Sequence, residues 1–171
     1  MELNALLAQP VALPSLPRTV ALLMNELAHP QPSLRRINLL FGSDPALAAR
    51  LLELANSPAL QMPRQVAGIS EALALLGNAQ VRTLVAASTL GTAARSVPGI
   101  NLQQFWRYSR NTAKLARSLA GSVQQSQVAA YTAGLLHALG ELIIHLAHPD
   151  KVQSLNTLVS PLDVRRGKVE Q

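Results

Sequence analysis

The sequence predicts an all-α protein, and three observations support this fold class. Leucine and alanine dominate the 171 residues while β-branched residues are sparse, and this composition favours helices. Apolar residues recur at helical spacing, as at Leu47, Leu51 and Ala55, which we expect to face a core. No segment pair shows the alternation and glycine turn of a β-hairpin. We therefore expect a helical bundle of two small lobes.

Capping residues place the helices at the start of the chain. A short helix is expected over residues 1–8 and a second from about 18 to 28, with an extended, proline-containing stretch between them. Ser33 is a suitable N-cap for a third helix, which Gly42 should end. These signals predict short helices joined by tight connections.

The next helices have equally clear boundaries. Asp44 followed by Pro45 predicts a helix start, because an N-cap residue then precedes a proline at the first helical position. Residues 56–68 are expected to form an ordered loop. Ser70 should cap a helix that ends at Gly77, and Asn78 should cap the one that follows. An ordinary helical hairpin is favoured here over a DNA-binding helix-turn-helix.

The sequence Val97-Pro98-Gly99 marks the internal boundary. We expect an N-terminal lobe over residues 1–96, a second lobe over 100–160 and a polar tail over 161–171. In the second lobe, Asn101 should cap a helix that runs to about residue 120. An apolar helix containing His137 should follow and be broken by Gly140. A last helix is expected over 149–159.

The histidines invite two interpretations. His137 lies within an apolar run, and we expect it to be a buried core histidine held by a hydrogen bond, in preference to a metal ligand or proton carrier. His145 and His148 are three residues apart and could together chelate zinc weakly. We favour solvated side chains near a helix C-terminus for that pair, because two ligands without a third make a poor site.

A basic row is the sharpest feature of the helix that begins after Asn101. Arg107, Arg110, Lys114 and Arg117 recur at helical spacing, within about 80° of one another. The opposite side carries Tyr108, Thr112, Leu115, Ala116 and Leu119, which we expect to be buried. The row should then face water, as a solvated face or as a dock for phosphate, a nucleotide or an acidic protein surface.

Charge and composition narrow the class of protein. The net charge is +6, and no Asp or Glu occurs from Ala72 to Gly140, which suggests an anionic partner. The absence of cysteine excludes disulfides and thiolate metal sites. The N-terminus lacks the basic region of a signal peptide, and apolar runs stop short of a membrane span. A cytoplasmic bacterial protein without membrane insertion is expected.

The stretch LLHALGEL resembles the histidine–aspartate centre of the HD superfamily of metal-dependent phosphohydrolases. In that pattern a histidine is followed by an aspartate and, three residues later, by a lysine. Here His137 matches the histidine, Ala138 stands at the aspartate position and Glu141 at the lysine position. The family's first histidine lies upstream after an aromatic pair, and Tyr108 stands there. The two histidines and the aspartate are the metal-ligand positions among these. The resemblance therefore implies that, of Tyr108, His137 and Ala138, only His137 survives as a ligand.

Three further blocks narrow the resemblance to HDOD domains, the HD-related output domains. They are LPSLPRTVALLMNEL, SDPALAARLLELANSPAL and GISEALALLGNAQVRTLV, in the family's order and spacing. HDOD domains are output or adaptor modules of bacterial signal transduction. They usually continue for several more helices, so the second lobe is expected to be truncated at its C-terminus.

The leading functional hypothesis is a non-catalytic regulatory module that binds a protein partner in a signalling pathway, or a nucleotide or other anion. Neither a metal nor another cofactor is expected, because Ala138 supplies no charge to hold a cation and Tyr108 is a neutral phenol. Two alternatives remain: a metal-dependent phosphohydrolase with atypical ligands, and a nucleotide or nucleic-acid binder that uses the basic row. The sequence does not decide whether the protein forms a homo-oligomer.

Overall fold

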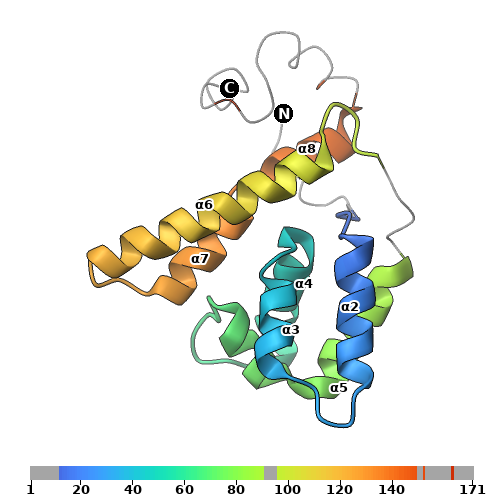
Figure 1. The fold of residues 1–171 in the computed structure, drawn as a ribbon, viewed down its shortest axis with the longest axis vertical. Coiled ribbons are helices and arrows are strands. Elements are labelled where there is room, and N and C mark those ends of the chain that lie inside the picture. The colour runs from blue at the N-terminus through green and yellow to red at the C-terminus, as the bar shows by residue number, and fades with distance from the viewer. Residues whose placement is uncertain (1–11, 91–95, 150–151, 153–162, 164–171) are drawn as a thin grey trace.

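The computed structural model describes residues 12–90, 96–149, 152 and 163, and these residues contain helices and no β-strand (Figure 1). The expected all-α class is confirmed. The elements are α2 (Pro17–Ala28), α3 (Leu34–Phe41), α4 (Pro45–Ala55), the 3₁₀ turn η1 (Pro58–Leu60), α5 (Ile69–Leu90), α6 (Leu102–Ser122), α7 (Gln127–Leu136) and α8 (Leu139–Ala147). The helices predicted over 1–8 and 149–159, and the tail over 161–171, lie wholly or mostly outside the described residues.

Helices α2 to α5 form a bundle, and α6 and α7 form a hairpin that lies across one end of it (Figure 1). The bundle core is built from fully buried side chains such as Leu23, Phe41 and Leu51. Leu135 of α7 joins this core, because α7 packs on α4 and α5. Apolar burial therefore continues from the bundle into the hairpin.

The predicted N-caps Ser33, Asp44 and Asn101 are confirmed, since each side chain accepts a hydrogen bond from its helix's first turn. Asp44 does more. Its Oδ1 accepts from the N–H groups of Ala46 and Leu47 at 3.0 and 3.1 Å, and its Oδ2 accepts from the N–H of Leu16 at 2.6 Å. Burial raises the pKa of Asp44, although these three N–H groups and nearby Arg50 oppose the shift.

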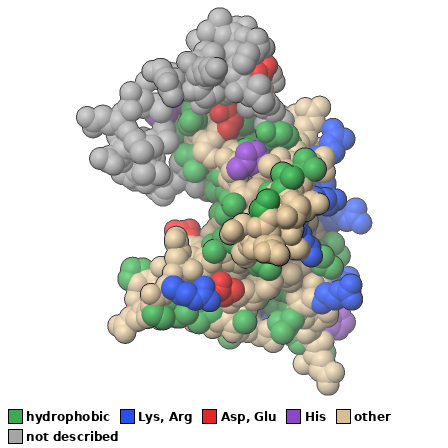
Figure 2. All heavy atoms as spheres, turned by 90° about the vertical axis from the view of Figure 1, so that its left-hand side faces the viewer, with side chains coloured by type: hydrophobic (Ala, Val, Ile, Leu, Met, Phe, Trp, Pro, Cys, Tyr) green, Lys and Arg blue, Asp and Glu red, His purple; other side chains and the backbone are tan. Residues whose placement is uncertain are grey.

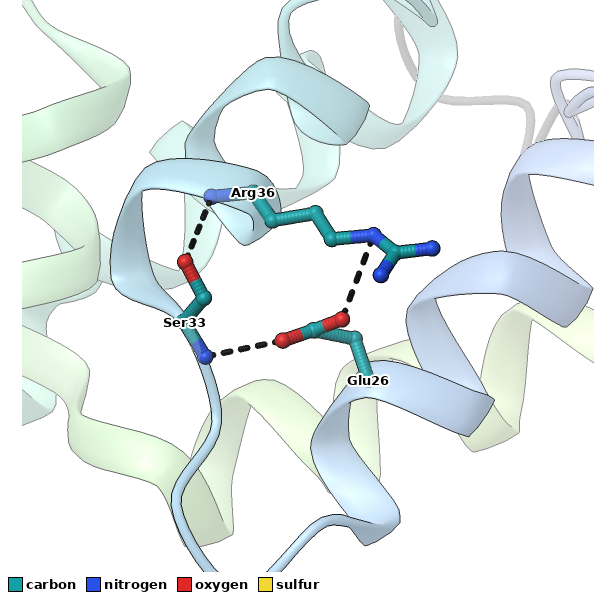
Figure 3. Close-up of polar contacts among 3 residues, drawn as sticks. All are labelled: Glu26, Ser33 and Arg36. Carbon is teal, nitrogen blue, oxygen red and sulfur yellow. Dashed lines mark hydrogen bonds and ion pairs between the residues drawn. The ribbon is translucent and has the colours of Figure 1, made fainter.

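A second buried carboxylate joins α2 to α3 (Figure 3). Glu26 accepts a hydrogen bond from the N–H of Ser33 at 2.8 Å and pairs with Arg36 Nε at 3.2 Å. Ser33 Oγ in turn accepts from the N–H of Arg36 at 3.3 Å. The buried carboxylate of Glu26 thus has hydrogen-bond and ion-pair partners at the connection between α2 and α3, as burial of a charged group requires.

Helix α5 is two helices that meet at Gly77, as predicted. Gly77 has φ 69°, a left-handed conformation that ends one helix and suits glycine. The predicted Ser70 N-cap is wrong. The helix begins at Ile69, the carbonyl of Gly68 accepts the N–H of Ala72 at 3.0 Å, and the Ser70 hydroxyl instead donates to Asn38 Oδ1 at 3.3 Å.

The break between α7 and α8 falls at His137 and Ala138, so the predicted break at Gly140 is wrong. His137 Nδ1–H donates to the carbonyl of Gly134 at 2.7 Å, in the last turn of α7, where the carbonyl groups lack intrahelical N–H partners. Among the described residues, Gln127–Ala147 is long and apolar enough to cross a membrane by length and composition. It is instead two helices packed into the domain.

Helices α6 and α7 approach closely at Gly134. A Cβ built at Gly134 would lie 2.8 Å from the Cα of Ala113 and 3.0 Å from both the Cβ of Ala116 and the carbonyl oxygen of Thr112. No side chain fits between the two helices there. The hairpin can pack at this distance because glycine removes the obstacle.

Helix α8 buries His145 rather than exposing it, so the predicted solvated His145–His148 pair is wrong. His145 is 0% exposed, and its Nδ1–H donates to the carbonyl of Pro98 at 2.8 Å. Its Nε2 lies 2.9 Å from Glu141 Oε1. The reason is helical phase, since His145 follows buried Leu142 by three residues and shares its face. Polar contacts thus tie α8 to the residues before α6.

We expect Gly134→Ala to lower the free energy of unfolding by about 1–3 kcal/mol, because the new methyl group overpacks the α6–α7 contact. Chemical denaturation measures the change. Gly140→Ala is the matched control: it lies inside α8 with nothing within 4 Å of the new Cβ, so it should be neutral or stabilising by about 0.5–1 kcal/mol. Equal effects of the two variants would contradict the close approach.

We expect His145→Ala to cost about 2–4 kcal/mol of unfolding free energy, because it leaves a cavity and removes the hydrogen-bond partner of Pro98. His137→Ala should cost less than about 1 kcal/mol, since that side chain is exposed. Thermal and urea unfolding of the two variants provide the comparison. A larger loss for His137→Ala would reverse the assignment of the structural histidine.

Candidate binding site

Tyr108 of α6 and His137 at the end of α7 are brought together, as the HD resemblance implied. Their ring centroids are 5.2 Å apart and the rings are tilted by 51°. The expectation that His137 is buried is wrong, because its side chain is exposed, and Tyr108 is 36% exposed. The helix break places the imidazole at the surface instead of between helices.

The donors around His137 do not fit a metal ion. Ala138 follows it, and Glu141 lies at hydrogen-bond distance from His145. Across the described residues, no group of three or more His, Cys, Asp or Glu side chains could hold a cation. Phosphohydrolase metal sites need several oxygen and nitrogen ligands that converge on the ion. The arrangement around His137 can make hydrogen bonds and ring contacts, and we assign no metal-dependent step to it.

The basic row lies along the surface of α6. Arg107, Arg110, Lys114 and Arg117 are all exposed. Figure 2 views the molecule from the side of the turn that joins α6 and α7, and Lys and Arg side chains gather along one edge of that view. In the described part of the chain, none of the four forms an ion pair. The row therefore retains its positive potential.

The prediction that the side of α6 opposite the row is buried is wrong for Tyr108, Leu115 and Leu119, which are exposed, while Thr112 and Ala116 are half-buried. Leu115 is 66% and Leu119 67% exposed. The buried face lies between this side and the basic row, and it consists of Phe105, Trp106, Ser109, Ala113 and Ala120. The sequence pattern was misleading because α6 has three faces, of which two meet solvent.

The basic row divides between two cavities. Lys114 and Arg117 line a cavity of about 390 Å³ that also reaches α3, α5 and α7. Arg107 and Arg110 line another, of about 480 Å³, beside Leu16. Sequence reasoning found the cations but neither cavity, because the other walls come from segments far away in the chain.

Tyr131 of α7 also lines the first cavity, and the sequence analysis did not identify it as a functional residue. Its hydroxyl donates to the carbonyl of Gly42 at 2.9 Å, which ties α7 to the end of α3. Burial raises the pKa of Tyr131, although the charges of Arg110 and Arg117 oppose the shift. The phenol therefore stays neutral and keeps its donor role at neutral pH.

Comparison with solved structures shows the same fold in two bacterial proteins. The MmoQ response regulator of Methylococcus capsulatus is similar with a TM-score of 0.76 and 25% identity, over 91% of this chain and 64% of that one. A virulence factor of Campylobacter jejuni is similar with a TM-score of 0.65 and 24% identity, over 91% of this chain and 58% of that one. This chain thus spans under two thirds of either structure.

Sequence comparison agrees. An uncharacterized protein of Treponema pallidum is 28% identical over 148 residues, which cover 85% of this chain and 29% of that protein. The model of the HDOD domain matches residues 13–171. That match includes every block on which the resemblance rested. The chain therefore belongs to the HDOD domain family.

Proposed function

We propose that this chain is a non-catalytic output or adaptor module of bacterial signal transduction, which works in the cytoplasm by binding a protein partner or a small anion. One observation supports this most directly. Of the three positions that the HD resemblance assigns to metal ligands, only His137 has a metal-binding side chain, and its neighbours are Tyr108 and Ala138. Without a convergent carboxylate, the superfamily's way of activating water is lost.

The relatives support a signalling role in general terms. The MmoQ protein is named a response regulator, and this chain matches it over most of its own length. That name describes MmoQ and identifies neither a signal nor a partner for this chain. For this chain, we infer the signalling role from shared family and fold, and the binding role from its own surface.

Helix α6 supplies the surface for a protein partner. Its basic row lies on one side, and the exposed apolar residues Tyr108, Leu115 and Leu119 lie on the other. No acidic residue occurs in α6 or α7 to neutralise the row. The chemistry that complements this combination is an acidic protein surface with apolar side chains of its own.

We expect the protein to show no metal-dependent hydrolysis of phosphate esters. Purified protein with Mn²⁺, Mg²⁺ or Zn²⁺ should cleave bis(p-nitrophenyl) phosphate no faster than His137→Ala does, because the described residues supply no group of ligands to hold a metal with His137. Wild-type hydrolysis that depends on metal and disappears in His137→Ala would refute the proposal. The variant that combines Tyr108→His with Ala138→Asp supplies the missing imidazole and carboxylate. It should bind one divalent ion that the wild type does not, as measured by metal analysis after dialysis.

We expect binding through the basic row to weaken steeply with salt, because exposed charges are screened beyond a Debye length of about 8 Å at physiological ionic strength. Retention on immobilised polyglutamate, measured across a salt series, reports this interaction. Changing Arg107, Arg110 and Arg117 to Gln should reduce retention. Changing Arg18, Arg35 and Arg64 to Gln removes the same charge elsewhere and is the control. Equal retention of both variants would mean that the row is only a solvated face.

A further inference from the structure

We propose that the cavity of about 390 Å³ between α3, α5, α6 and α7 binds a nucleoside monophosphate, or a small phosphomonoester of similar size with an apolar body. This deepens the small-anion part of the proposed function and rests on it. The volume falls within the range of about 300–1,000 Å³ that is usual for small-molecule sites. Its walls combine two cations, polar groups and apolar side chains.

The cations select a phosphate group. Lys114 and Arg117 are one helical turn apart on α6 and both line the cavity. Neither is ion-paired within the described residues, and no residue that lines the cavity is acidic. Lysine offers a compact charge and arginine a planar fork of N–H donors, a combination that suits the oxygens of a phosphomonoester dianion.

Polar groups opposite the cations can complete the contacts to a phosphate. Ser70 lies in the first turn of α5, and its hydroxyl donates to Asn38 Oδ1 at 3.3 Å. The Asn38 side chain thereby keeps its amide N–H donors for another acceptor. Gln127 begins α7 and also lines the cavity. The N-terminal ends of α5 and α7 add positive potential at this wall.

Apolar side chains form the remaining wall and favour an organic body over inorganic phosphate. Leu39 is 64% and Val128 50% exposed, and both line the cavity beside the ring of Tyr131. Val128 and Tyr131 have packing or hydrogen-bonding partners outside the cavity. A Cβ built at Gly68 would lie 2.6 Å from Val128 Cγ1, and the Tyr131 hydroxyl donates a hydrogen bond to the carbonyl of Gly42. A base or similar ring would cover this wall, which free phosphate leaves in water.

The division of the basic row favours a small ligand over a nucleic acid. A single strand tracks cations along one continuous groove and stacks its bases on several aromatic side chains. Here Arg107 and Arg110 line a separate cavity, and Tyr131 is the aromatic residue among those lining the first cavity. One phosphate and one ring match that content.

Isothermal titration of the protein with the four nucleoside 5′-monophosphates tests the site, with adenosine and inorganic phosphate as separate probes. At least one nucleotide should bind, and adenosine and phosphate should each bind about tenfold or more weakly, a difference that corresponds to about 1.4 kcal/mol. Lys114→Gln and Arg117→Gln should each weaken nucleotide binding about fivefold or more. Arg18→Gln removes an equal charge from α2, outside both the cavity and the basic row, so it should leave the affinity unchanged.

Leu39→Ala provides an independent check, because Leu39 is exposed and its removal should not disturb folding. It should weaken nucleotide binding while leaving phosphate binding unchanged. The proposal falls if no nucleotide binds at millimolar concentration, or if Arg18→Gln weakens binding as much as Arg117→Gln does. Either result would leave the protein-binding role intact. Cleavage of the nucleotide during titration would instead refute the non-catalytic function.

Discussion

The close contact between α6 and α7 at Gly134 is the constraint on which the surface of the α6–α7 hairpin depends. Because Ala113 and Ala116 lie against the glycine with no room for a methyl group, the rotation of each helix about its axis is fixed. That rotation places Tyr108 beside His137 on one side of the contact. It places Lys114 and Arg117 beside Tyr131 on the other. One backbone approach thus creates two separate surfaces.

The segment that precedes α2 links the two hydrophobic cores. Leu13 and Leu16 pack against the second core, which contains Phe105, Trp106 and Leu142. The same segment is held to α4 by polar contacts, since Asp44 accepts the N–H of Leu16 and Arg50 Nη2 donates to the carbonyl of Leu13 at 2.6 Å. Apolar contacts and buried hydrogen bonds therefore act on one short stretch. The first turn of α4 is coupled to the packing of α6 in this way.

Local signals predicted the helices well, and tertiary context decided what the sequence could not show. Ser33, Asp44 and Asn101 were found from the sequence because an N-cap involves only its own first turn. The predicted burial of His137 and the predicted exposure of His145 are both wrong. The exposure of His137 depends on the helix break, and the burial of His145 involves the carbonyl of Pro98, 47 residues away. The cavity could not be found at all, since four helices contribute to it.

Catalysis and binding make opposite demands on the α6–α7 hairpin. A metal-dependent hydrolase needs acids and imidazoles that converge where water is controlled. A binding module needs apolar and charged side chains that remain open to a partner. In this chain His137 faces solvent beside Tyr108, the carboxylate of Glu141 lies against buried His145, and Leu115 and Leu119 are exposed. Glu141 therefore contributes to packing where an acid nearer His137 would have served a metal. The exposed charged and apolar side chains of the hairpin thus suit the binding role proposed for it better than a metal-dependent one.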